Sequence, residues 1–388
     1  MAVSQWQIRL RRPSELTEPE QRAWAALEGR AVEPNAFLSP HFVLPALRYL
    51  DPTAKVMLLW VERLAAGGRQ VVAVGVFRGS PGTRAFPWPH LVAYQSEHTY
   101  LGGMLVDAEV LLPVVEQIQH FLQRRLSPWK GLELPKLRAD GPLAQAFRAL
   151  ATQQQLPAQL LGPQDRSMLT LADCGEALLN KALGKKLNEI NRCKRRLEEM
   201  GTLTWECLWK DGVPETSVDA FLALEHRGWK GESGTSLQST EAGREFFREM
   251  VRRFDGDGRR ALFTELRLNG EAVASTCNFV SGDMGFAFKV GWDPDLRKLG
   301  PGMLNEVEFI RRFKDHPHAH EITAFDSGAS ADSFINRLWL DQRSLGLLLM
   351  PSSRMAGLAL QATRRLRESR QGVAPQDASN AIVAKAEA

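Results

Sequence analysis

The segment with the clearest chemical potential is the turn Arg297-x-x-Gly300-x-Gly302, between a predicted strand and a predicted helix. Backbone N–H groups and the positive end of the helix dipole would converge there, so a phosphate could bind. The glycines let the backbone approach closely, and Arg297 can add a charge-assisted hydrogen bond. Pro301 lacks an N–H but suits the first position of a helix. The turn predicts a diphosphate site; an ordinary Gly/Pro helix cap is the alternative.

Two carboxylates could accept a proton near such a site. Asp326 ends a predicted parallel strand, and ligands of α/β folds gather at the carboxyl ends of such strands. The alternative is a turn cap in Asp-Ser-Gly. Glu225 falls on the apolar face of a predicted helix, where a carboxylate is either paired or functional. A salt bridge with Arg227 or Lys230 explains Glu225 equally well.

Four further side chains could bind a substrate. Trp229 and Lys230 could line an acceptor site, although a core Trp beside a solvated Lys fits as well. Lys289, on a predicted strand, could contact a phosphate or an acceptor carboxylate, or be a surface residue. Trp339 could close the cleft, and packing is its alternative role.

The elements that must position the turn form a three-stranded meander, a helix and one more strand. Asn269-Gly270 is a strong hairpin signal, because both turn residues need a positive φ. The last strand must run parallel to the third, since a helical crossover separates them. The predicted elements are strands 260–268, 271–280 and 284–292, helix 302–315 and strand 321–326.

The first half of the chain repeats this order without the motif. Its predicted elements are strands 55–63 and 70–78, a strand within 91–100, helix 108–125, strand 131–137 and helix 141–153. Leu101-Gly102-Gly103 stands where the second half has its turn, and it lacks the arginine and the glycine spacing. We expect this half not to bind the same ligand, but to shape an acceptor cleft.

The pattern predicts an α+β fold (an α/β mixed sheet) with two similar domains joined near residues 160–175. We expect domains at 1–165 and 166–350, followed by a C-terminal helix and disordered tail at 351–388. Helices are also expected over 175–199 and 345–370.

Composition narrows the class of protein. The chain has 388 residues, 44% hydrophobic and 24% charged, which excludes collagen-like, coiled-coil and wholly disordered proteins. No stretch reaches the roughly 18 apolar residues that span a bilayer, and no secretory signal is visible. Four scattered cysteines without a C-x-x-C pair argue against metal and disulfide frameworks and suit the cytoplasm.

Two charged or histidine-rich segments have a simpler explanation than ligand binding. The net charge of +4 is too small to indicate nucleic-acid binding by itself. Helix 181–196 holds seven basic residues, which more often form a solvated face. His316, His318 and His320 lack the partners that would complete a metal site, so we expect no metal.

Several segments together carry a family resemblance. The meander, the R-x-x-G-x-G turn, the helix and the next strand resemble the acetyl-coenzyme A binding core of the GNAT acyltransferase superfamily. The chain further resembles the CelD/BcsL-like acetyltransferases associated with cellulose biosynthesis, and its tandem-GNAT architecture resembles Fem-type aminoacyltransferases. Gly328 stands where a Cys is expected in close relatives, so a thiol role there is in doubt. The segments that carry the narrower resemblance are Phe221–Gly231, Thr235–Leu237, Leu299–Gly302, Asp326–Ala329 and Ile335–Trp339.

The resemblance implies a fold and a site. Each domain would be a mostly antiparallel sheet with a parallel β-α-β crossover. The co-substrate would be acetyl-CoA or another acyl-CoA, with its pyrophosphate on the N–H groups around Gly300, Gly302 and Met303. Its pantetheine arm would pair with the strand edge near Val290 and Gly291, where a backbone N–H would stabilise the oxyanion.

The resemblance also implies the reaction and leaves rivals open. The expected function is acyl transfer, to an amine of a small-molecule or saccharide acceptor, in polysaccharide or cell-envelope biosynthesis. One rival is a Fem-type aminoacyltransferase that uses charged tRNA. The other is a non-catalytic scaffold that binds the components of a cellulose synthase complex.

Overall fold

The computed structural model describes residues 5–65 and 68–371. They form two units, and the chain passes from the first to the second between Asp165 and Arg166, where the sequence also predicts the domain boundary. Residues 34–52 belong to unit 2, whereas the described residues from Ser344 onward belong to unit 1. The second domain was expected to extend to residue 350. The chain from Ser344 belongs to unit 1 instead, because residues 345–351 pair with a strand of that unit.

Unit 1 combines a mixed set of strands with helices. Its elements are β1 (Trp6–Arg11), α1 (Glu18–Glu28), β2 (Val56–Ala65), β3 (Gly68–Ser80), β4 (His90–Ala93), β5 (Leu105–Val106), α3 (Leu111–Gln123), β6 (Gly131–Arg138), α4 (Pro142–Gln153), the larger part of β13 (Asp341–Pro351) and α11 (Arg354–Gln371). The strand order is β1-β2-β3-β4-β6-β13, with β5 beside β3. β4 and β6 are parallel, and the other neighbours are antiparallel.

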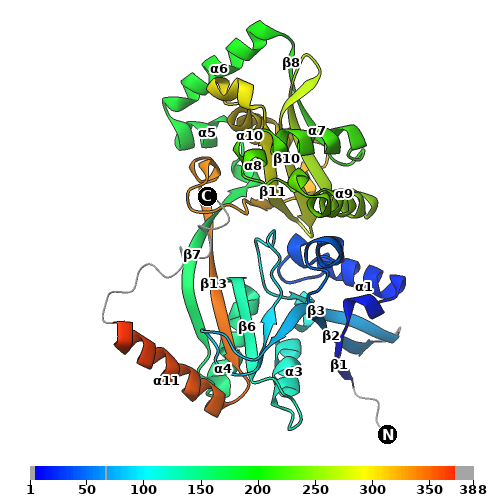
Figure 1. The fold of residues 1–388 in the computed structure, drawn as a ribbon, viewed down its shortest axis with the longest axis vertical. Coiled ribbons are helices and arrows are strands. Elements are labelled where there is room, and N and C mark those ends of the chain that lie inside the picture. Colours follow the sequence, from blue (N-terminus) through cyan, green and yellow to red (C-terminus); the bar gives the residue numbers. More distant parts are fainter. Residues whose placement is uncertain (1–4, 66–67, 372–388) are drawn as a thin grey trace. The chain divides into compact units, whose positions relative to one another are not determined.

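Unit 2 follows the same plan (Figure 1). Its elements are α2 (Pro40–Pro45), the end of β7 (Gln159–Thr170), α5 (Glu176–Leu183), α6 (Lys186–Met200), β8 (Leu203–Leu208), α7 (Glu215–His226), α8 (Trp229–Glu232), α9 (Glu241–Gly256), β9 (Ala261–Leu268), β10 (Glu271–Ser281), β11 (Met284–Trp292), α10 (Pro301–Arg312) and β12 (Ala324–Asp326). The strand order is β7-β12-β11-β10-β9-β8, and the pair β11–β12 is parallel.

The two units share one topology, which confirms the predicted repeat of elements. In each, a strand and a helix precede a three-stranded meander, and a crossover helix leads to a parallel strand. An antiparallel neighbour completes each set: β13 beside β6 in unit 1 and β7 beside β12 in unit 2. Each unit is therefore completed by a strand that comes from outside its own repeat.

Three expectations about individual elements are wrong. Residues 341–351 form β13 and not the start of a helix, because the apolar run at 345–350 is a buried strand, which periodicity alone cannot separate from a helix. The helix expected at 175–199 is two helices, since Gly184 (φ 51°, ψ −125°) interrupts it. The expected linker at 160–175 contains β7.

Helices cover both faces of the unit 2 strands and define the buried space around the candidate site. Gly291 of β11 lies against the backbone of α7, and Thr276 of β10 bonds to Glu306 of α10. Neighbouring strand residues point to opposite faces, so α7 and α10 lie on opposite sides of β10 and β11. In the described ranges, no helix is long and apolar enough to cross a membrane.

Candidate functional site

The turn between β11 and α10 has the conformation that its glycines predict. A short 3-10 helix, η7 (Pro294–Leu299), leads into Gly300, whose φ of 59° and ψ of 52° lie in the left-handed region. The Gly300 N–H donates to the Arg297 carbonyl oxygen at 3.2 Å. Gly300 therefore supplies a backbone conformation, and its amide is already used within the turn.

The next residues provide the amides that point out of the helix. Pro301 occupies the first helical position, and Gly302 and Met303 follow in the first turn of α10, where N–H groups have no intrahelical acceptor. Gly302 is buried, and a Cβ there would lie 3.2 Å from the Trp292 ring. Two of the three expected amides, those of Gly302 and Met303, are thus placed to bind an anion.

The charges around the turn favour an anion. Arg227 pairs with Asp293 at 2.9 Å and with Asp295 at 2.7 Å, so one guanidinium group compensates part of the negative charge of these two carboxylates. Arg297 and Lys298 are exposed and form no ion pair with any described residue. The positive end of α10 adds to their field.

β11 continues beyond its parallel partner. The ladder joins Met284, Gly285 and Phe286 to residues 324–326; β12 then ends, while β11 runs on to Trp292. A bulge at Phe288 interrupts the pairing of β11 with β10. Beyond Phe286, β11 therefore has an edge that β12 does not cover. A thiol-bearing arm would need such an edge in order to lie along β11.

Val290 and Gly291 lie in this extension. Val290 is half-buried and pairs with Thr276 across the ladder. Gly291 is buried, and a Cβ there would lie 2.6 Å from the Glu225 backbone nitrogen. Gly291 is therefore required for the close packing of α7 on β11.

Glu225 is one of the two predicted proton acceptors and forms a salt bridge, but not with the residues expected. Its side chain is fully buried and lies 3.4 Å from the Nζ atom of Lys289. Its other oxygen accepts a hydrogen bond from the Leu237 N–H at 2.8 Å. The sequence predicted Arg227 or Lys230 as a partner, and Arg227 instead pairs with the two aspartates beside η7. Glu225 and Lys289, 64 residues apart, thus form one buried charged pair.

Asp326, the second predicted proton acceptor, is held by two arginines. Its Oδ2 atom lies 2.9 Å from Arg343, and its Oδ1 atom lies 3.8 Å from Arg166. Oδ1 also accepts from the Gly328 N–H at 2.8 Å, which is the turn cap that the sequence offered as an alternative. All three charged side chains are at least 87% buried, so Asp326 anchors two guanidinium groups.

The remaining predicted substrate residues differ in placement. Trp339 is 2% exposed and packs against Phe325, with 6.2 Å between ring centroids. It lies in the core of unit 2, so packing, the alternative, is its observed role. The side chains of Trp229 and Lys230 lie outside the described residues.

The equivalent segment of unit 1 is closed. Leu101, Gly102 and Gly103 are buried, and a Cβ on Gly102 would collide with the Pro135 carbonyl oxygen. The Gly102 N–H donates to the Lys136 carbonyl oxygen at 3.0 Å. This packing leaves no space for a phosphate on that amide, in keeping with the missing arginine.

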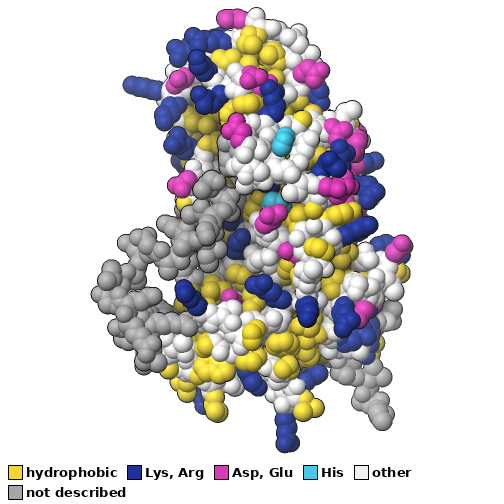
Figure 2. Space-filling view, viewed as in Figure 1, with side chains coloured by type: hydrophobic (Ala, Val, Ile, Leu, Met, Phe, Trp, Pro, Cys, Tyr) yellow, Lys and Arg dark blue, Asp and Glu magenta, His cyan; other side chains and the backbone are white. Residues whose placement is uncertain are grey.

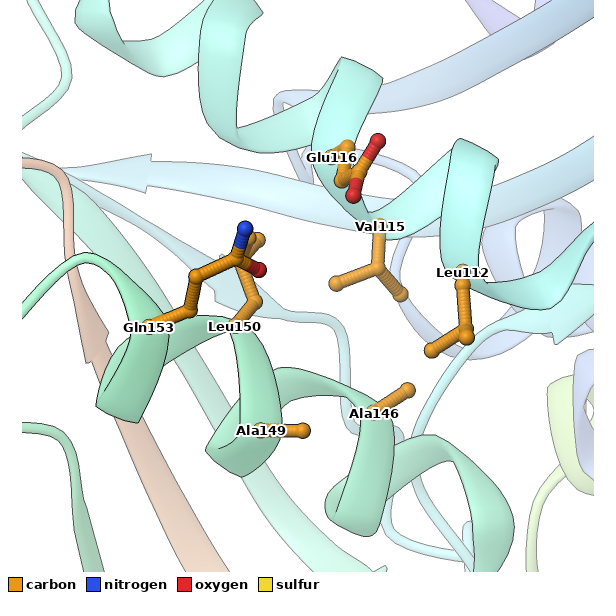
Figure 3. Close-up of a pocket in the computed structure, with 7 residues that line it drawn as sticks. All are labelled: Leu112, Val115, Glu116, Ala146, Ala149, Leu150 and Gln153. Carbon is orange, nitrogen blue, oxygen red and sulfur yellow. The ribbon is translucent and has the colours of Figure 1, made fainter.

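Unit 1 has a separate small groove between α3 and α4 (Figure 3). Its volume of about 130 Å³ is far too small for a nucleotide, and none of the predicted site residues lines it. The lining residues are Leu112, Val115, Glu116, Ala146, Ala149, Leu150 and Gln153.

Two features of unit 2 were beyond the sequence analysis. Arg166 was assigned to a linker, and nothing in the sequence relates it to Asp326, 160 residues later. The rings of His316, His318 and His320 follow one another from Trp209, with neighbouring centroids 5.5–6.4 Å apart; the first two pairs are tilted and the last pair is stacked. Aromatic packing therefore accounts for this histidine pattern.

The comparisons with known proteins agree with this geometry. Residues 184–334 match a family described as an acetyltransferase (GNAT) domain. No curated protein matches the chain. FemX has a similar structure, with a TM-score of 0.55 and 10% identity over 90% of this chain and 98% of its own.

Two further solved structures have comparable similarity. One is a conserved protein of unknown function from Bacteroides thetaiotaomicron, with a TM-score of 0.53 and 10% identity over 89% of this chain and 100% of its own. The other is the C-terminal domain of a putative lysylphosphatidylglycerol synthetase from Agrobacterium fabrum, with a TM-score of 0.50 and 13% identity over 88% and 94%. At such identities these likenesses establish the fold. Residues 184–334 thus match an acetyltransferase (GNAT) domain, which supports acyltransferase activity for this part of the chain.

Proposed function

We propose that unit 2 transfers an acyl group from acyl-CoA to an amine in the cytoplasm. The observation that carries this proposal is the turn at 297–303, where a left-handed glycine, two first-turn amides and an exposed arginine converge. A diphosphate fits this arrangement, because the helix dipole and the amides both favour negative charge. The pantetheine arm would then follow β11 toward the bulge at Phe288.

The reaction needs one nucleophile and one proton acceptor. The amine nitrogen attacks the thioester carbon, a main-chain N–H of β11 near Val290 stabilises the oxyanion, and the CoA thiol leaves. A carboxylate accepts the proton that the amine loses. Glu225 suits this role better than Asp326, because Asp326 faces two guanidinium groups and a turn amide, whereas Glu225 faces one ammonium group and one amide.

The acceptor class rests on the family resemblance. The CelD/BcsL-like motifs favour an amine on a saccharide or envelope precursor, and a polysaccharide synthase as partner. A second candidate for the acyl donor is an aminoacyl group carried by tRNA, as the resemblance to Fem-type aminoacyltransferases implies. The fold shared with FemX and with a putative lysylphosphatidylglycerol synthetase domain is compatible with this candidate. The exposed basic residues of α6 favour that candidate, since tRNA binding is strongly electrostatic.

Calorimetric titration with acetyl-CoA tests the proposed co-substrate. We expect the wild type to bind, Arg297→Ala to bind about 10-fold more weakly, and Gly302→Val about 100-fold more weakly. The valine side chain would press on the Trp292 ring, which lies 3.2 Å from a Cβ at this position, and so displace the first turn of α10 that carries the amides. Gly256→Val is the matched control, because a Cβ at Gly256 meets nothing within 4 Å. A wild type that gives neither heat nor a thermal shift would refute acyl-CoA binding.

The role of Glu225 is tested by Glu225→Gln. Glutamine keeps an oxygen for the Leu237 N–H but cannot take a proton from the amine. We expect kcat to fall about 100-fold while the Kd of acetyl-CoA stays unchanged. Lys289→Met removes the partner of Glu225 without removing the carboxylate. A Glu225→Gln enzyme with normal kcat would exclude Glu225 as the proton acceptor.

A further inference from the structure

Helix α6 lies outside the repeated topology and packs directly on the phosphate turn. It precedes β8, the strand with which the repeat in unit 2 begins. Its Leu197 shares a hydrophobic cluster with Leu296 and Leu299 of η7. The Sγ atom of Cys193 lies 4.0 Å from the Lys298 carbonyl oxygen. These contacts set α6 beside η7 and fix which of its flanks faces the turn.

One flank of α6 is neutralised by α10. Lys194 donates to Glu308 at 2.9 Å, and Asn191 accepts from Arg311 at 2.9 Å. Both α6 residues lie on the side away from Cys193, so this flank is committed to packing unit 2 together. Its polar groups are therefore occupied by α10 and not available to a ligand.

The opposite flank presents free positive charge. Arg196 follows Cys193 by three residues and so shares its side of the helix, and Arg192 precedes Arg196 by four. Both are exposed, and within the described part of the chain neither forms an ion pair. Two exposed carboxylates also lie on this flank: Glu189, one turn before Cys193, and Glu199, three residues after Arg196. Figure 2 shows Lys and Arg side chains gathered over the end of unit 2 where Figure 1 places α6.

We propose that Arg192 and Arg196 of α6, together with Lys298 of η7, bind the 3′-phosphate of acyl-CoA. The inference rests on the proposed function. In CoA the 3′-phosphate and the 5′-diphosphate are attached to one ribose, so a diphosphate on the Gly302 amide brings the 3′-phosphate to the edge of the turn. That edge is bordered by α6. A phosphate dianion matches two guanidinium groups and an ammonium, none of which forms an ion pair with a described residue.

The arrangement gives a role to exposed basic residues on a helix that lies outside the repeated topology. The diphosphate is shared by many nucleotides, whereas the 3′-phosphate distinguishes CoA from most of them. The α6 flank would therefore select the co-substrate before any chemistry at the thioester. Because the groups are exposed, their contribution should be modest and should weaken as salt is added.

Titration with CoA and with 3′-dephospho-CoA tests the proposal. We expect the wild type to bind CoA about 10-fold more tightly than the dephospho form at low salt, and the difference to shrink at high salt. Arg192→Gln/Arg196→Gln should lose most of this preference, since only Lys298 of the three cations remains, with the affinity for 3′-dephospho-CoA unchanged. Lys181→Gln/Arg195→Gln removes the same charge from exposed positions away from Cys193 and should keep the wild-type ratio.

The possible failures can be told apart. Equal affinity of the wild type for the two nucleotides, or an unchanged ratio in the Arg192→Gln/Arg196→Gln variant, would overturn the α6 subsite and leave acyl-CoA binding intact. Absence of binding by both nucleotides would overturn the proposed function as well. If the variant kept its nucleotide ratio but lost salt-sensitive binding of a tRNA, the flank would be assigned to nucleic acid and the proposal rejected.

Discussion

Replacing Asp326 by alanine should lower the free energy of unfolding by about 3–5 kcal/mol. The carboxylate lies between Arg343 and Arg166. The side chain of Asp326 is only 2% exposed, that of Arg343 9% and that of Arg166 13%. Alanine would leave two guanidinium groups in a region of low water content without this shared counter-charge. It would also remove the acceptor for the Gly328 N–H. Urea denaturation of the wild type and the variant measures the difference.

Two further variants separate the contributions of Asp326. Asp326→Asn keeps an oxygen for the Gly328 N–H and removes only the charge, so its loss of stability should be smaller. Asp332→Ala is the matched control, because Asp332 is exposed and should change stability by less than about 0.5 kcal/mol. A fully stable Asp326→Ala protein would refute the anchoring role. An Asp326→Asn protein of normal stability that has lost turnover would restore Asp326 as the proton acceptor.

The parts of the site that are local in sequence could be predicted. Each strand of the meander begins and ends within one residue of its predicted bounds. Alternating apolar and polar residues and the Asn269-Gly270 turn specify a hairpin without reference to the rest of the chain. The positive φ of Gly300 and the start of α10 at Pro301 follow from local sterics in the same way. What local pattern cannot specify is the role of each amide: Gly300 uses its own within the turn.

The contacts that depend on distant residues could not be predicted. Glu225 was correctly placed as a buried carboxylate, but its partner, Lys289, lies on a strand whose register is set by packing. The two strands that complete the units were missed for related reasons. β7 contains Gly and Pro and resembles a linker, and β13 has a continuous apolar run that resembles a helix. Both are stabilised by pairing with strands far away in sequence.

Replacing Glu306 by glutamine should stabilise the protein at alkaline pH. Glu306 is buried under α10, and burial raises its pKa from the ordinary 4.5 to about 7, although a hydrogen bond from Thr276 opposes the shift. Between these two pH values the folded protein holds a proton that the unfolded chain has released. The stability contributed by Glu306 is therefore present in full below pH 4.5 and is lost as the pH rises through 7, by about 3 kcal/mol in all.

Glutamine keeps the oxygen that accepts from Thr276 and stays neutral at every pH. We therefore expect Glu306→Gln to match the wild type near pH 4.5 and to exceed its free energy of unfolding by about 3 kcal/mol above about pH 8. Urea denaturation at the two pH values measures this directly. A wild-type protein whose stability does not fall across this range, relative to Glu306→Gln, would show that Glu306 keeps its ordinary pKa.

Glu308, two residues away on the same helix, provides the opposite control. Burial acts to raise its pKa too, but Lys194, Arg311 and Arg312 together outweigh burial and lower it. A carboxyl with a lowered pKa adds stability above its unfolded pKa and loses it on acidification, so Glu308→Gln should destabilise the protein at neutral pH. Two buried glutamates on one helix should thus respond with opposite signs to the same substitution, because Glu308 has cationic partners, whereas Glu306 accepts a hydrogen bond from the Thr276 hydroxyl. If both variants lost stability at neutral pH, a general intolerance of α10 to glutamine would replace the electrostatic explanation.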